Sequence, residues 1–120
     1  MAPRVHNSGH WTIEGAETSQ FENHVRAILG YPLGDTRAIG HSVMINLIGV
    51  VPPVEHILQF RDAHLHLYGK QSRPGRKLGH VTVHGDDARA VRKSAEKIRS
   101  EMHALTKENK PQSAALFYED

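Results

Sequence analysis

The sequence has 120 residues, of which 38% are hydrophobic and 23% charged, a balance typical of one small domain with a modest core. Its formal net charge of only +2 is too small to indicate nucleic-acid binding, and the absence of cysteine excludes a disulfide framework and thiolate catalysis. The longest apolar stretch, 43–51, is too short to span a bilayer and no signal-peptide pattern is present, so we expect a cytoplasmic protein without a membrane partner.

The first fifteen residues, MAPRVHNSGHWTIEG, show neither helical nor strand periodicity and are rich in turn-forming residues, which predicts an ordered loop. Five of them place hydrogen-bonding groups close together around Gly9: Arg4, His6, Asn7, Ser8 and His10. The Asn-Ser-Gly run can offer backbone N–H groups to an anion. Equally, Asn7 and Ser8 can close a turn that Trp11 anchors, so the residues leave both interpretations open.

Local patterns predict the elements of the middle of the chain. Ser19 and Glu22 form a capping box at the start of a helix that ends at Gly30. Its apolar face contains Phe21, Val25, Ile28 and Leu29. Alternating apolar residues predict a strand over 42–48, and the apolar residues after the Pro52-Pro53 pair predict a short helix.

The stretch 63–85 predicts two strands on either side of a Gly/Pro-containing loop. Apolar residues on one face of these strands should meet the core: Leu65, Leu67, Val81 and Val83. The opposite face, which carries histidines, is expected to face solvent. The loop carries four cations: Lys70, Arg73, Arg76 and Lys77. Guanidinium groups on a stiff turn suit a phosphate, although an exposed loop can also be cationic for solubility alone.

A long helix is predicted after the hairpin, because apolar residues recur at steps of three and four from Ala88 to Leu105. Asp86 and Asp87 can cap its start, and its apolar side should cover the sheet while the charged side faces solvent. The residues from 106 onward lack a sustained pattern, which predicts an irregular tail.

Ten histidines raise the possibility of a metal site. His64 and His66 on one strand, with His80 or His84 across the hairpin, would have a separation suited to zinc. The same alternation arises on any solvent-facing strand, so we assign no metal ligand from the sequence and keep a histidine-rich metal-binding domain as an alternative function.

Three motifs in order, APRVHNSGHWTIEG, TSQFENHVRAILG and HLHLYGKQSRPGRKLGHVTV, resemble the C-terminal portion of the 5-(carboxyamino)imidazole ribonucleotide synthase family. These ATP-grasp ligases of purine biosynthesis are also described as the ATPase subunit of phosphoribosylaminoimidazole carboxylase. The resemblance implies an α+β fold. Residues 1–40 would be the C-terminal end of an ATP-grasp domain, 41–105 a small antiparallel β-sheet domain of the rudimentary hybrid-motif kind with its covering helix, and 106–120 the tail.

The resemblance also implies a reaction in which ATP phosphorylates bicarbonate, with magnesium, and carboxyphosphate then carboxylates the exocyclic amine of aminoimidazole ribonucleotide. The N-terminal motif would lie at the carboxylation and substrate pocket: Arg4, His6, Asn7 and Ser8. The basic loop would hold the ribonucleotide phosphate through Lys70, Arg76 and Lys77, with Arg73 beside them. Val5 stands where the family usually has a proline, which would change the loop geometry.

Met1 stands where the family has the isoleucine of an Asn-Glu-Ile motif, whose glutamate is a magnesium ligand. We therefore expect this chain to lack the ATP-binding elements, to be inactive alone, and to need an N-terminal ATP-grasp portion as its partner. Apolar surface left uncovered would favour a homo-oligomer. The alternative function of a different class is a stand-alone anion-binding or interaction module.

Overall fold

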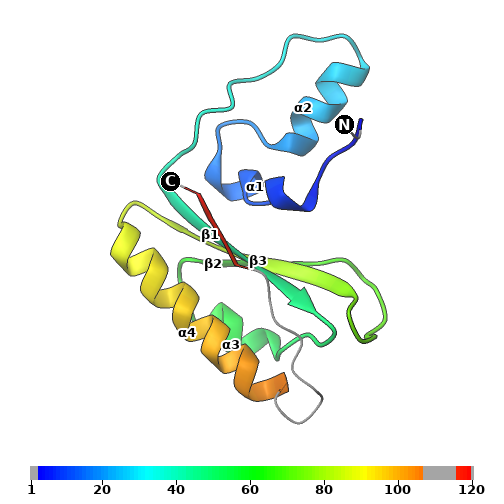
Figure 1. Cartoon of the computed structure of the whole chain (residues 1–120). Coiled ribbons are helices and arrows are strands. Elements are labelled where there is room, and N and C mark those ends of the chain that lie inside the picture. Colours follow the sequence, from blue (N-terminus) through cyan, green and yellow to red (C-terminus); the bar gives the residue numbers. More distant parts are fainter. Residues whose placement is uncertain (1–2, 107–115, 120) are drawn as a thin grey trace.

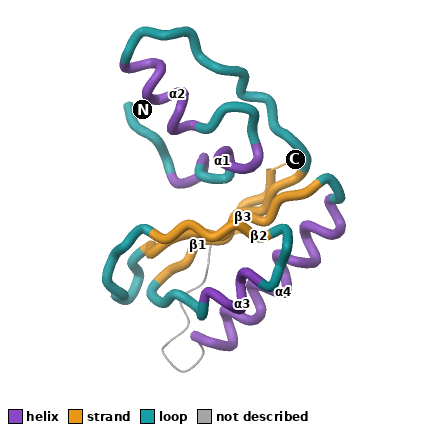
Figure 2. The backbone as a smooth tube through the Cα atoms, turned by 180° about the vertical axis from the view of Figure 1, so that it is seen from behind, coloured by secondary structure: helices purple, strands orange, loops and turns teal. Residues whose placement is uncertain are grey.

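The structure is a computed structural model that describes residues 3–106 and 116–119. Its centre is a four-stranded antiparallel sheet in the order β2-β3-β1-β4. Helices α1 and α2 lie on one face of this sheet, and α3 and α4 lie on the other (Figures 1 and 2). The predicted α+β class is therefore confirmed. Among the described residues, no helix combines the length and the apolar character needed to cross a membrane.

The strands are β1 (His41–Ile48), β2 (Ala63–Leu67), β3 (Lys77–Gly85) and β4 (Leu116–Glu119). The predicted hairpin is present, with His66 opposite His80 in the β2–β3 ladder. β1 pairs with β3 on its other edge, and Asn46 there lies opposite His80. The predicted irregular tail is corrected for Leu116–Glu119, which pair with β1, whereas residues 107–115 lie outside the described part of the chain.

The hydrophobic core lies between the sheet and helices α3 (Val54–Leu58) and α4 (Ala88–Thr106). Alternate residues of β1 and β3 meet the inner side of α4, as their periodicities predict. The core includes Val43, Ile45, Leu47, Ile57, Val81, Val83, Val91, Ala95, Ile98 and Met102. Asp87 caps α4, because its Oδ1 accepts a hydrogen bond from the Arg89 N–H at 3.0 Å. Leu67, at the end of edge strand β2, is 50% exposed and does not join the core as predicted.

The N-terminal segment forms a layer on the second face of the sheet. It contains a 3₁₀ turn (Asn7–Gly9), α1 (Thr12–Gly15) and α2 (Gln20–Ile28), so part of the predicted loop is helical. The predicted cap is present, since the Ser19 hydroxyl accepts from the Glu22 N–H at 3.1 Å. At Gly15 a Cβ atom would collide with the Ser42 hydroxyl of β1, so this glycine permits α1 to approach the sheet closely.

On β1 and β3 this second face of the sheet is buried, so the prediction that it faces solvent is wrong there, whereas His64 on β2 is exposed as predicted. Five of its side chains belong to residues exposed by at most 3%: Ser42, Met44, Asn46, His80 and Thr82. The alternation of the strands was correctly located, but the apolar–polar pattern cannot show that another layer covers the polar side. Backbone hydrogen bonds from Glu17 to Arg37 and from Ile39 to Gly15 join the N-terminal layer to the segment that leads into β1.

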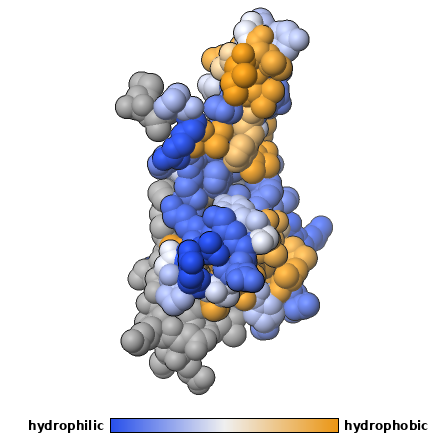
Figure 3. Space-filling model, turned by 90° about the vertical axis from the view of Figure 1, so that its right-hand side faces the viewer, coloured by the Kyte–Doolittle hydropathy of each residue, from blue (hydrophilic) through white to orange (hydrophobic). Residues whose placement is uncertain are grey.

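A patch of apolar side chains remains exposed on α2 and the loop that follows it (Figure 3). Ile28 is the most exposed of them at 69%, and the patch also includes Val25, Leu29, Tyr31 and Leu33. The sequence predicted an apolar face on this helix; Phe21 at its start stacks on His10, whereas the rest of that face remains exposed. Contiguous apolar surface of this kind commonly marks a contact with another chain or domain.

Candidate functional site

Gln20, the first residue of α2, fixes the shape of the N-terminal motif. Its side-chain oxygen accepts a hydrogen bond from the His6 N–H at 3.0 Å, and its Nε2 group donates to the His6 carbonyl at 2.7 Å. The same amide nitrogen lies 2.8 Å from Nδ1 of His10. A single amide side chain therefore holds both ends of the 3₁₀ turn, so the motif has a defined conformation.

The four residues predicted from this motif occupy different positions. His6 and Ser8 contact one another, with His6 Nδ1 2.9 Å from the Ser8 hydroxyl and accepting from the Ser8 N–H at 3.2 Å. Arg4 is exposed and donates, within the described part of the chain, to the carbonyl of Val5, and Asn7 accepts the His10 N–H through its carbonyl. The turn predicted as the structural alternative is therefore formed, and it leaves the Arg4 guanidinium available to a ligand.

The basic loop connects β2 to β3. A hydrogen bond from the Arg76 N–H to the Arg73 carbonyl closes its turn, in which Gly75 has a φ of 75°. The Lys70 ammonium lies 5.7 Å from the centre of the Tyr68 ring, a cation–π distance. Within the described residues, no ion pair neutralises any of its four cations, Lys70, Arg73, Arg76 and Lys77.

His10 connects the N-terminal motif to the hairpin. Its ring stacks on Phe21 at 5.3 Å and on His80 at 5.2 Å between centroids, and it meets the Tyr68 ring edge-on at 6.1 Å. Burial lowers the pKa of His10, and the nearby positive groups of Lys77, His6 and His66 lower it further. Lys77 of the basic loop is thus electrostatically close to the motif that holds His6.

The structure brings the two predicted groups of residues to one end of the molecule. The N-terminal segment and the β2–β3 loop lie at the same end of the sheet in both views (Figures 1 and 2). In the described part of the chain, no hydrogen bond or ion pair joins the two groups directly. The bridge consists of His10 and Tyr68, neither of which the sequence singled out as a site residue.

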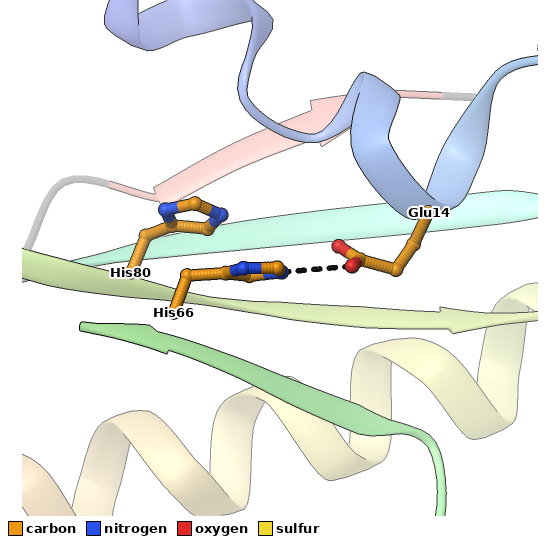
Figure 4. A group of neighbouring side chains, drawn as sticks. All are labelled: Glu14, His66 and His80. Carbon is orange, nitrogen blue, oxygen red and sulfur yellow. Dashed lines mark hydrogen bonds and ion pairs between the residues drawn. The ribbon is translucent and has the colours of Figure 1, made fainter. Parts of the chain in front are cut away.

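A second feature lies beneath this bridge, where Glu14 of α1 approaches two histidines of the sheet (Figure 4). His66 Nε2 lies 2.7 Å from Glu14 Oε2, and His80 Nδ1 lies 2.8 Å from the Tyr68 hydroxyl. Burial lowers the pKa of His80 to about 3, helped by the charges of His66 and His10. Of the histidines predicted for a metal, His66 and His80 join this group, whereas His84 bonds Ser42 and His64 is exposed.

Magnesium, which the family resemblance implies, does not fit this group. Two of the three ligand atoms would be imidazole nitrogens, whereas Mg²⁺ prefers oxygen ligands in octahedral geometry. Elsewhere in the described residues, no group of three His, Asp or Glu side chains lies close enough together to share a metal ion. We therefore assign no magnesium ligand to the described residues.

Comparison with known proteins gives concordant matches in sequence and in fold. Residues 42–94 match the phosphoribosylaminoimidazole carboxylase C-terminal domain, and residues 1–21 match the ATP-grasp domain. The N5-carboxyaminoimidazole ribonucleotide synthase of Pseudomonas aeruginosa is 63% identical over 83 residues, which are 69% of this chain and 23% of that protein. The chain belongs to the N5-carboxyaminoimidazole ribonucleotide synthase family. Its members are ATP-grasp ligases, and the match is to their C-terminal portion.

Solved structures of synthases support the same assignment. The Thermus thermophilus synthetase superposes with a TM-score of 0.81 at 59% identity, covering 83% of this chain and 28% of that one. The Aspergillus clavatus synthase, solved in complex with ADP and 5-aminoimidazole ribonucleotide, superposes with a TM-score of 0.76 at 37% identity, covering 82% of this chain and 29% of that one. The chain thus spans between about a quarter and a third of the length of these synthases.

The buried neutral His80 predicts a specific acid sensitivity for this synthase relative. Its pKa is about 6.5 in the unfolded chain and about 3 in the folded one, so below pH 6.5 the unfolded state binds one more proton than the folded state. Above pH 6.5 the neutral His80 carries no penalty for folding. As the pH falls from 6.5 toward 3, its protonation in the unfolded state lowers the free energy of unfolding. The free energy of unfolding can be measured by urea denaturation between pH 8 and 4. Its decline with falling pH should be less steep in His80→Gln than in the parent, and the two slopes should differ by up to about 1.4 kcal/mol per pH unit.

Met44→Ala provides the matched control. It removes another fully buried side chain from the same face without removing a titratable group, so it should lower stability at every pH and keep the slope of the parent. Equal slopes in His80→Gln and the parent would contradict the assignment.

Proposed function

We propose that this chain is the C-terminal part of an enzyme that uses ATP and bicarbonate to carboxylate aminoimidazole ribonucleotide in purine biosynthesis, and that it supplies the substrate-phosphate side of the active site. One observation carries the proposal: His10 and Tyr68 bring the N-terminal motif to the same end of the sheet as a basic loop that forms no ion pair with any described residue. The Aspergillus relative, which was solved with ADP and 5-aminoimidazole ribonucleotide, identifies the substrate class to test.

The basic loop has the chemistry to hold the ribonucleotide phosphate. Arg73 and Arg76 can each offer two parallel N–H donors to phosphate oxygens, and Lys70 and Lys77 add compact positive charges. These cations are not neutralised by a described carboxylate, so an anion relieves their mutual repulsion. The packing of Lys70 over Tyr68 keeps one of these charges next to His10 and the N-terminal motif.

The N-terminal motif is suited to the reacting end of the substrate. The Arg4 guanidinium is exposed and can pair with a carboxylate, which is the form of both bicarbonate-derived and product groups. His6 and Ser8 form a hydrogen-bonded pair that can accept and donate near the exocyclic amine, and the Asn7 amide can do both. Gln20 holds this motif in place before the substrate arrives, which lowers the entropic cost of orienting it.

In this proposal, the rest of the enzyme binds the nucleotide and its magnesium. The described residues provide no all-oxygen metal site, and the chain spans only 23% of the length of the Pseudomonas synthase. We therefore assign ATP binding to an ATP-grasp portion outside this sequence. The role of this chain is to position aminoimidazole ribonucleotide beside the carboxyl group that the other portion activates.

The loop predicts how substrate affinity responds to charge removal. Lys70→Ala and Arg76→Ala should each weaken binding of aminoimidazole ribonucleotide, measured by calorimetry, by about 1–3 kcal/mol, because each removes a charge-assisted hydrogen bond. The effect should be larger at low salt. Lys93→Ala is the matched control, since it removes an equal charge from the exposed side of α4 and should leave affinity unchanged.

Two results would contradict the proposed role. Unchanged affinity in both loop variants would show that the loop is cationic only for solubility. Equal affinity of the parent chain for inorganic phosphate and for aminoimidazole ribonucleotide would favour the alternative of a stand-alone anion-binding module, because the imidazole and ribose would then make no contact.

The exposed apolar patch on α2 predicts a partner for this chain. We propose that the ATP-grasp portion covers the patch in the whole enzyme, and that the isolated chain covers it by self-association. Several hundred Å² of apolar area at about 25 cal/mol per Å² offsets part of the entropic cost of association. Sedimentation of the parent should therefore show a dimer or larger species, and Ile28→Lys with Leu29→Lys should shift it toward monomer.

The control for this experiment is a charge change away from the patch. Ser100→Lys on the exposed side of α4 adds positive charge without touching α2, and it should leave the association unchanged. A strictly monomeric parent would contradict the predicted self-association. It would show that the isolated chain keeps the apolar patch exposed to solvent.

A further inference from the structure

Buried polar atoms without partners gather between the N-terminal layer and the sheet. In the described residues they are Glu14 Oε1, His80 Nε2, the Thr82 hydroxyl and both polar atoms of the Asn46 side chain. Asn46 and His80 face one another across β1 and β3, and His80 faces His66 across β3 and β2. A buried polar atom without a hydrogen bond is costly, so these atoms need partners that a polar ligand or ordered water would supply.

The geometry of three of these side chains narrows the class of ligand. Glu14, His66 and His80 each offer one ligand atom, and the three atoms lie within 4.8 Å of one another. They come from α1, β2 and β3, so the fold rather than local sequence assembles them (Figure 4). His80 is 1% exposed, and the Glu14 side chain is 15% exposed.

We propose that Glu14, His66 and His80 bind a divalent transition-metal ion of the zinc class, which joins the N-terminal layer to the sheet. Two imidazoles and one carboxylate suit Zn²⁺ and leave a fourth position for water or an anion, whereas they do not suit Mg²⁺. This site is separate from the proposed substrate function and does not depend on it.

The surroundings of the three side chains match those of a metal site. The Tyr68 hydroxyl is hydrogen-bonded to Nδ1 of His80, which fixes the ring and leaves Nε2 for the ion, as the outer partners of ligating histidines do. The low pKa of His80 keeps its ring neutral, which is the ligating form. On binding, Nε2 of His66 would replace its hydrogen bond to Glu14 with a bond to the ion, and the N–H proton of the neutral ring would then reside on Nδ1.

Metal binding should also change the stacking of the two rings. The His66 and His80 rings lie 4.6 Å apart between centroids with planes at 19°, so their nitrogen lone pairs lie in two nearly parallel planes. Convergence on one ion requires the rings to tilt toward one another. This movement should change the NMR signals of the two rings in the parent chain, so the test does not depend on whether a variant folds.

The test is a zinc titration of the full chain at neutral pH, followed by calorimetry and by the ring-nitrogen NMR signals of the histidines. The parent should bind zinc with shifts in the His66 and His80 signals. Glu14→Gln and His66→Gln should weaken the affinity at least about tenfold. The matched control His64→Gln removes an exposed histidine two residues away on the same strand, and its zinc affinity should equal that of the parent.

Three outcomes would overturn the proposal. Absence of shifts at His66 and His80 on zinc addition would show that ordered water fills the space. An affinity equal to the parent in both Glu14→Gln and His66→Gln would place the ion elsewhere. An equal loss in His64→Gln would show binding by surface histidines. None of these results depends on whether the chain binds aminoimidazole ribonucleotide. The zinc site and the proposed substrate function can therefore be contradicted independently of one another.

Discussion

The stack of the His10 ring on His80 is the interaction on which the arrangement of this chain depends. The hydrophobic core between the sheet and α4 includes none of the first forty residues. The N-terminal layer contacts the opposite face of the sheet instead. Phe21, His10, His80 and His66 form a continuous series of stacked rings through that interface. Each such ring pair contributes about 0.5–1.5 kcal/mol beyond the area that it buries.

This arrangement explains why β3 has two buried faces. Val81 and Val83 face α4 and provide hydrophobic stabilisation, while His80 and Thr82 face the N-terminal layer. An all-apolar second face would bind the layer without a preferred position, whereas the stack of His10 on His80 and the hydrogen bond between Glu14 and His66 select one position. The selected position puts the motif that carries His6 beside the loop that carries Lys70 and Lys77, which is what the proposed function requires.

The sequence predicted the elements better than the relations between them. Local signals were sufficient for the Ser19 cap, for the strands around the basic loop and for α4, because capping and periodicity depend on neighbours in the chain. The burial of His80 was missed, since a polar alternation looks the same under solvent and under a polar layer. Glu14 and Gln20 were missed as well, because their partners lie on segments that only the tertiary fold brings together.

The docking of the N-terminal layer is tested most directly by amide hydrogen exchange in His10→Ala. The N–H groups of Glu17 and Ile39 bond across the junction between the layer and the segment that enters β1, so they are protected only while the layer is docked. Loss of the three ring contacts of His10 should speed their exchange by about tenfold or more, while β1 amides that pair with β3 keep their protection. His24→Ala, a histidine on α2, should leave both unchanged. Unaltered exchange at Glu17 and Ile39 in His10→Ala would contradict the claim that the ring stack holds the two motifs together.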